Sequence, residues 1–130
     1  MGIPTYNQND NPILKHSFAF AANVLKLTDD LLEMKKYTVA NQLSRSGTSI
    51  GANVFESQSA ESRLDFIHKL KIAAKEAEET KYWLMLCKEM GYLNEDKLLN
   101  ELEVICKILG KIISSSRINQ KNQKIESISK

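Results

Sequence analysis

Residues that could catalyse a reaction or bind a metal are few in this chain of 130 residues. Di-iron sites in helix bundles use a Glu-x-x-His motif on each of two helices. The nearest match here is Asp65 followed by His68, and His16 stands alone in the sequence. Cys87 and Cys106 lie far apart and match no metal-ligand spacing. We therefore expect no metal, no cofactor and two free thiols.

Neither an activated nucleophile nor a phosphate-binding loop is predicted. Ser49 and His68 could supply a nucleophile and a base, but no nucleophile-elbow motif surrounds Ser49. Gly47 and Gly51 are followed by Ala52, whereas a phosphate-binding loop requires Lys after its second glycine. We therefore expect that the protein is not an enzyme.

The stretch SRSGTSIGANVFES, residues 44–57, is rich in poor helix formers, yet it follows a helical pattern. Each glycine costs about 1 kcal/mol relative to Ala inside a helix. Core-type positions nevertheless recur at helical spacing through the stretch, at Val39, Leu43, Ser46, Ile50 and Val54. Gly47 and Gly51 share one face of this helix, which predicts the close approach of another helix there. Ala at either position is then expected to clash.

The same periodicity divides the chain into four helical segments and predicts no strand. The first segment begins at Pro12 and fades through residues 33–36, and the second follows Thr38 and breaks at residues 57–60. The third begins near Ser62 and ends at Gly91, and the fourth follows Asn94 and ends at the serines 114–116. The expected N-caps are Asn11, Thr38 and Asn94, Ser62 or its neighbour is expected to start the third helix, and Gly91 is expected to end it. Short connections between four helices predict an all-α fold, an antiparallel up-down-up-down four-helix bundle. We expect residues 1–116 to form this bundle and residues 117–130 to form a polar, basic tail.

The first helix carries two adjacent apolar stripes rather than one. They consist of Leu14, Phe18, Ala21, Leu25, Thr28 and Leu32, and of Ile13, Phe20, Val24, Leu27 and Leu31. One stripe suffices for a monomeric amphipathic helix. Two stripes predict that this helix either lies at the centre of the fold or also faces another subunit.

Polar residues on the second and third helices are predicted to pair across the bundle. Arg45 and Lys75 are equally distant along the chain from the break at Ala60, so Arg45 is level with Glu76 and close to Glu79. We predict that Arg45 pairs with Glu76 or Glu79. By the same argument Glu56 is expected to pair with Arg63 or to cap the third helix. Asn53 completes this expected polar network, and Trp83 lies on the same flank as the two carboxylates.

Overall composition gives only weak functional signals. The formal net charge is +2, which by itself does not predict nucleic-acid binding. The segment 117–130 is more strongly basic, with four basic residues and one acidic residue. No apolar run is long enough to span a membrane, and no secretory signal is recognisable. We expect a cytoplasmic protein without a membrane partner.

The second and third predicted helices carry specific motifs. The first motif comprises Ser49, Ile50, Asn53, Val54 and Glu56, and the next comprises Asp65, Phe66, Ile67, Leu70, Ile72 and Ala73. Glu76, Glu79, Thr80, Trp83 and Leu84 follow as a third motif. Together they resemble the bacterial four helix bundle protein family, whose founding members are encoded in intervening sequences of 23S rRNA genes and are labelled S23 ribosomal protein. The resemblance covers residues 12–115. Ser57 departs from it, because many members carry Gly at that position.

This resemblance implies a non-enzymatic bundle that assembles as a homo-oligomer, a homopentamer. It also implies a relation to the accessory protein of diversity-generating retroelements, which binds structured nucleic acid and a partner protein. The expected function is therefore binding of structured RNA or DNA, and the alternative is an oligomeric scaffold without nucleic acid. Candidate phosphate contacts are Arg63, Lys69, Lys71, Lys75, Lys81, Arg117, Lys121 and Lys124. Gly47, Gly51 and Trp83 are the candidate packing or oligomer residues.

Overall fold

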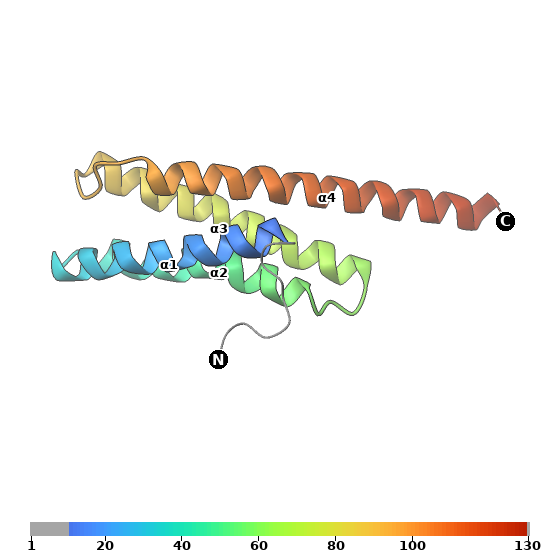
Figure 1. The fold of residues 1–130 in the computed structure, drawn as a ribbon, viewed down its shortest axis with the longest axis horizontal. Coiled ribbons are helices and arrows are strands. Elements are labelled where there is room, and N and C mark those ends of the chain that lie inside the picture. The colour runs from blue at the N-terminus through green and yellow to red at the C-terminus, as the bar shows by residue number, and fades with distance from the viewer. Residues whose placement is uncertain (1–10, 130) are drawn as a thin grey trace.

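The computed structural model describes residues 11–129 and consists of four helices without any strand in that range (Figure 1). Helix α1 spans Pro12–Glu33, α2 spans Tyr37–Ser57, α3 spans Arg63–Glu89 and α4 spans Lys97–Ser129. Helix α2 contacts α1 and α3, and α4 contacts α3 and α1. The chain therefore runs up-down-up-down around one core, as the periodicity predicted.

Three of the predicted helix ends are confirmed by their hydrogen bonds. The Asn11 side chain accepts from the backbone N–H of Leu14 at the start of α1, and Pro12 occupies the first helical position. The Ser62 hydroxyl accepts from the N–H of Asp65 at 3.0 Å and caps α3.

Gly91 ends α3 as predicted. Its φ of 76° is left-handed, a conformation that glycine adopts without steric cost. The N–H of Tyr92 then donates to the carbonyl of Cys87 at 2.9 Å, which closes a Schellman motif.

Two predicted caps are wrong. Helix α2 begins at Tyr37 rather than after Thr38, because α1 ends in a Schellman turn in which the N–H of Lys36 donates to the carbonyl of Leu31. Only residues 34–36 therefore connect α1 to α2. Asn94 does not cap α4, which begins only at Lys97. An ion pair between Lys88 and Asp96 ties the preceding residue to the end of α3.

Helix α4 is longer than predicted. The three serines 114–116 were expected to end it, but it continues to Ser129 and projects beyond the other helices (Figure 1). Residues 117–129 contain neither Gly nor Pro, and they include Arg, Lys, Gln and Glu, which favour helices. The boundary at 116 still has a structural meaning, since Ser116 is the last buried residue described in α4. The basic segment is thus an exposed helix rather than an irregular tail.

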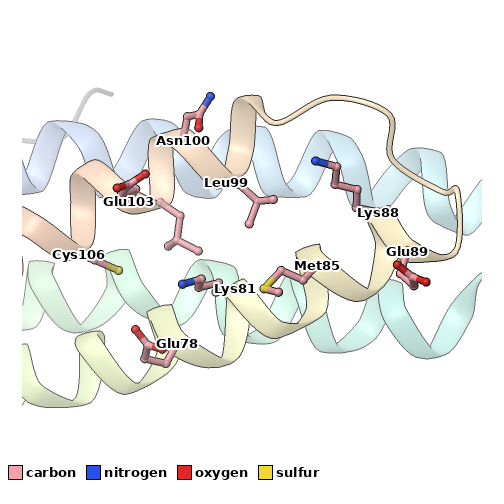
Figure 2. Close-up of a pocket in the computed structure, with 10 residues that line it drawn as sticks. Glu78, Lys81, Met85, Lys88, Glu89, Leu99, Asn100, Glu103 and Cys106 are labelled. Carbon is pink, nitrogen blue, oxygen red and sulfur yellow. The ribbon is translucent and has the colours of Figure 1, made fainter.

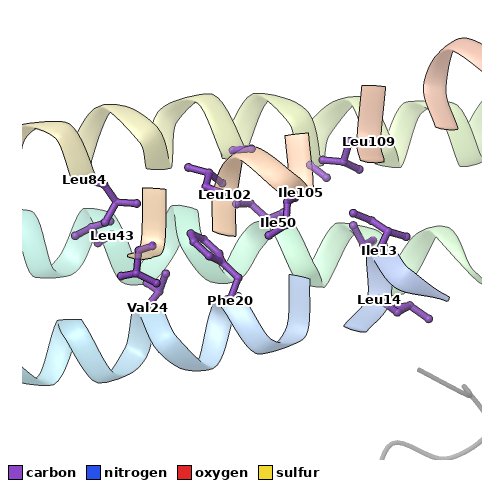
Figure 3. Close-up of a cluster of buried hydrophobic side chains, with 14 of the residues drawn as sticks. Ile13, Leu14, Phe20, Val24, Leu43, Ile50, Leu84, Leu102, Ile105 and Leu109 are labelled. Atoms are coloured by element: carbon purple, nitrogen blue, oxygen red, sulfur yellow. The ribbon is translucent and has the colours of Figure 1, made fainter. Parts of the chain in front are cut away.

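The core is one continuous cluster with side chains from all four helices (Figure 3). Its fully buried large members include Phe20, Leu31, Leu43, Ile50, Leu70, Leu84, Leu102, Ile105 and Leu109. The two stripes of α1 have different environments. Most of the Phe20 stripe is buried, whereas Phe18, Leu25 and Leu32 of the other stripe are exposed. None of the helices in residues 11–129 is both long and apolar enough to cross a membrane.

The two glycines of α2 lie against α1. A Cβ added at Gly47 would lie 2.7 Å from Cγ1 of Val24, and one at Gly51 would lie 3.2 Å from the carbonyl oxygen of Ser17. Both distances are shorter than ordinary van der Waals contacts. The predicted close approach is therefore confirmed, and its partner is a helix of the same chain.

Candidate nucleic-acid interface

Helices α2 and α3 are joined by a polar cluster centred on Arg45. Its guanidinium donates to Glu76 Oε2 at 3.2 Å and to Glu79 Oε2, and the indole N–H of Trp83 donates to the same Glu79 oxygen at 3.3 Å. The predicted pairing of Arg45 is thus present. Its side chain is 49% exposed, so solvent screens the pair and its contribution to stability is small. Its main effect is geometric, because a two-pronged Arg contact fixes the register of α2 on α3.

A buried hydroxyl pair lies beside this cluster. The hydroxyls of Thr80 and Ser46 are 2.9 Å apart, and the Thr80 hydroxyl also donates to the carbonyl of Glu76 at 2.7 Å. Both side chains are fully buried. The sequence places Ser46 at a core-type position and Thr80 in a family motif, but their contact is not predicted from it. Two buried hydroxyl groups on facing helices must form hydrogen bonds to each other or to the backbone, so this contact could have been inferred from the sequence.

The predicted partner of Glu56 in the polar network is wrong. Glu56 pairs with Lys69 at 3.3 Å rather than with Arg63 or the N-terminus of α3, which Ser62 caps. Arg63 lies about 140° around the helix from Glu76, which faces α2. Lys69 lies within about 20° of Glu76.

Asn53 also departs from the predicted network. Its side chain donates to the carbonyl of Ser49, one turn earlier in α2, at 2.9 Å. The contact is therefore local and does not join the two helices.

The candidate phosphate contacts on α3 lie in three environments. Lys71 and Lys75 are exposed on the outward face of the helix, and Arg63 is exposed in its first turn. Lys81 is exposed on the flank toward α4. Lys69 is only partly exposed and is neutralised by Glu56. Lys69 is therefore the weakest phosphate candidate of the five.

The candidate contacts on α4 share one side of its projecting end. Arg117, Lys121 and Lys124 are all exposed and fall within about 60° of one another around the helix. Glu126 lies on the opposite side. None of these three basic residues forms an ion pair with another side chain that the structure describes. The helical continuation of α4 thus groups positive charges that an irregular tail would scatter.

A groove of about 740 Å³ runs between α3 and α4 (Figure 2). Figure 2 shows Met85 and Leu99 pointing into it from the two helices, with Lys81 beside Met85 on α3 and Glu103 on α4. Cys106 lines the groove, and burial raises the pKa of its thiol; the Glu78 carboxylate adds to the rise and Lys81 opposes it. A raised pKa keeps the thiol protonated to higher pH, and a protonated thiol is a poor nucleophile.

The family model for the 23S rRNA-intervening sequence protein matches residues 9–115 of the chain. The chain belongs to this family. It is also similar to the 1.70 Å crystal structure of a protein with unknown function from the S23 ribosomal protein family of Bacteroides thetaiotaomicron. The two chains are 41% identical with a TM-score of 0.76, and the match covers 78% of this chain and 97% of the other. No protein of curated function matches the chain.

Membership in the intervening-sequence family agrees with the described geometry in one respect. The matched residues 9–115 end one residue before Ser116, the last buried residue described in α4. The family match therefore coincides with the packed bundle, and the basic end of α4 lies outside it. Within residues 11–129, no group of three or more His, Cys, Asp or Glu side chains is placed to hold a metal ion.

Proposed function

We propose that this protein is a non-enzymatic homo-oligomer that binds structured RNA through exposed basic side chains. The observation that carries the proposal is that Arg63, Lys71 and Lys75 are exposed on α3 without ion-pair partners among the described residues. Unpaired surface cations are available to replace the counterions of a phosphate backbone. The basic end of α4 would extend this surface beyond the bundle.

The oligomeric part of the proposal rests on an exposed apolar seam on α1. Phe18, Leu25 and Leu32 recur at heptad spacing and form one line along the helix, yet all three are exposed. Tyr37 and Phe55 of the adjacent helix α2 are exposed as well. A line of large apolar side chains on a soluble bundle favours burial against another protein surface. We propose that a second copy of this chain covers it, and the resemblance to the bacterial family supports a pentamer.

Oligomerisation would also compensate for the low net charge of the single chain, because it multiplies the basic groups on one assembly. A net charge of +2 gives one protomer little attraction for a polyanion. A ring of several copies repeats every basic group, so a weak patch becomes a multivalent surface. RNA binding would then depend on assembly, and both properties would be lost together when the apolar seam is disrupted.

The alternative is a scaffold that binds only proteins. It is favoured by the apolar seam itself, which needs no nucleic acid, and by Glu78 and Glu89, which interrupt the positive charge of α3. The two functions differ in what copurifies with the assembly and in their response to salt.

The test measures the native mass of the purified protein and then titrates it with a structured RNA at 50 mM and 200 mM salt. The proposal predicts a single oligomeric mass and an affinity that falls steeply between the two salt concentrations. A stable oligomer without salt-sensitive RNA binding would favour the scaffold. A monomer that binds no RNA would reject both.

A further inference from the structure

Tyr82 is an exposed aromatic side chain that packs against a neighbouring ring. It is 59% exposed on the outward face of α3. Its ring centroid lies 5.0 Å from that of Trp83, and the two rings are nearly perpendicular, at 78°. Edge-to-face pairs of this kind are favourable beyond the area that they bury. The Tyr82 ring therefore packs edge-to-face against Trp83 while more than half of the residue remains accessible.

Trp83 is in turn anchored to the neighbouring helix. Its indole N–H donates to Glu79 at 3.3 Å, and Arg45 of α2 donates to the same carboxylate oxygen. The cluster that sets the register of α2 on α3 thus also positions the ring against which Tyr82 packs. A preorganised ring loses little conformational entropy when a flat ligand stacks on it.

Two exposed lysines lie on the same line of α3. Lys75 and Lys71 precede Tyr82 by about two and about three helical turns, so all three point within about 20° of one direction. The rise of an α-helix places them about 10 Å and about 16 Å from Tyr82 along the axis. Glu78 and Glu89 flank Tyr82 on the same exposed side. The charge next to the ring is therefore negative, whereas it is positive further along the helix.

This arrangement fits a nucleic-acid strand that places a neutral base on Tyr82 and its charged backbone along the lysines. A base carries no net charge, so the carboxylates beside Tyr82 do not repel it and can accept hydrogen bonds from its amino groups. The phosphates of the adjoining nucleotides would lie toward Lys75 and Lys71. Bases inside a duplex are already stacked on each other, and only an unpaired base can stack on a side chain.

We propose that Tyr82 is the stacking platform for an unpaired base of the RNA, with Lys75 and Lys71 contacting the adjoining phosphates. The inference rests on the proposed RNA-binding function and adds a selectivity to it, since loops and bulges would bind more tightly than a continuous duplex. Arg45, Glu79 and Trp83 then act as positioning residues for Tyr82.

The experiment compares two RNAs that share one stem, a hairpin with an unpaired loop and a blunt duplex. Their affinities are measured for the full chain and for Tyr82→Ala, Tyr82→Phe and Leu64→Ala. Leu64 is the matched control, because it is 66% exposed on the same line of α3 but has no aromatic ring. Stacking of one base is worth about 1–3 kcal/mol, so Tyr82→Ala should weaken hairpin binding about 5- to 150-fold. Tyr82→Phe and Leu64→Ala should change it less than about 2-fold, as should all three variants on the duplex.

A second readout comes from Trp83, the only tryptophan of the chain. Hairpin binding should change its fluorescence, and Tyr82→Ala should remove most of that change. Equal losses on hairpin and duplex, or a failure of Tyr82→Phe to retain binding, would overturn the stacking role. An altered native mass of Tyr82→Ala would instead place Tyr82 in a contact between copies and would also overturn it.

The two levels of the proposal fail in different ways. If the unaltered protein shows no salt-sensitive RNA binding, the proposed function fails and the stacking role fails with it. If RNA binding is present and weakens in Lys71→Gln and Lys75→Gln but not in Tyr82→Ala, only the stacking role is rejected.

Discussion

Gly47 of α2 lies directly against Val24 of α1, and a Cβ added at Gly47 would lie 2.7 Å from Cγ1 of Val24. The β-branched side chain of Val24 is fully buried and cannot rotate away. The close packing of α1 on α2 therefore requires glycine at this position. This contact converts a residue that is unfavourable in an isolated helix into one that the bundle needs.

We predict that Gly47→Ala lowers the free energy of unfolding by about 1–3 kcal/mol, because overpacking exceeds the gain of about 1 kcal/mol in helix propensity. Gly51→Ala should have a smaller effect, since its nearest contact, Ser17 O, is 3.2 Å away. The matched control is Gly110→Ala on α4, where an added Cβ meets nothing within 4 Å. That variant should gain up to about 1 kcal/mol. Urea unfolding measures all three, and a stabilised Gly47→Ala would contradict the packing argument.

The buried hydroxyls of Thr80 and Ser46 should be energetically coupled. Thr80→Val removes the hydroxyl while keeping the shape of the side chain, so it should cost about 1–3 kcal/mol by leaving buried polar groups without a partner. Adding Ser46→Ala should then cost much less than Ser46→Ala does alone, because the partner is already gone. A double-mutant cycle by urea unfolding measures the coupling. Strictly additive costs would mean that the two hydroxyls act independently.

The Cys87 thiol should make stability depend on pH above about 9. Burial raises its pKa from 9.0 to about 11 in the folded protein. The unfolded chain therefore loses this proton first, so the stabilisation is complete below pH 9 and is lost as the pH rises toward 11. Unfolding free energies measured from pH 8 to 11 should fall more steeply for the unaltered protein than for Cys87→Ala. Parallel pH profiles would show that the thiol titrates alike in both states.

The exposed lysines of α3 should contribute unequally to RNA affinity. Lys71→Gln and Lys75→Gln should each lower the slope of log affinity against log salt by about 0.7–0.9. Lys69→Gln is the control, because Lys69 is already paired with Glu56 at 3.3 Å and should change the slope least. Removing residues 117–130 should lower the slope further if Arg117, Lys121 and Lys124 contact phosphates. RNA titrations at several salt concentrations measure these slopes. If Lys69→Gln lowered the slope more than Lys71→Gln and Lys75→Gln do, the predicted ranking of the lysines would be wrong.

The exposed seam of α1 should control assembly. Leu25→Lys places a charge in the middle of the line formed by Phe18, Leu25 and Leu32, so burial against a second copy becomes unfavourable. The native mass should shift toward the monomer while helicity is retained, because Leu25 is not part of the core. Val104→Lys on α4 is a matched control, since Val104 is also exposed but lies off the seam. An unchanged native mass for Leu25→Lys would show that the interface between copies does not include this seam.

Local sequence signals predicted most of the fold because helix formation and capping depend on nearby residues. Asn11, Ser62 and Gly91 carried enough information to place their helix ends. The prediction at Thr38 failed because the turn that ends α1 leads directly into α2. At the start of α4, Asp96 is paired with Lys88 and the helix begins after it, at Lys97. Counting residues from the break at Ala60 located the partners of Arg45. It failed for Glu56, because Glu56 lies opposite Lys69 rather than Arg63, and Arg63 points to another side of α3.

By itself, the sequence determined the all-helical class, the family motifs and the helical state of the glycine-rich stretch, because all three depend on spacing along the chain. Only the tertiary structure decided which stripe of α1 is buried, that Thr80 meets Ser46, and that Tyr82 is held against Trp83 with more than half of it exposed. The reason is that periodicity fixes the face of a helix on which a side chain lies. The neighbour that covers that face depends on how helices distant in sequence pack together.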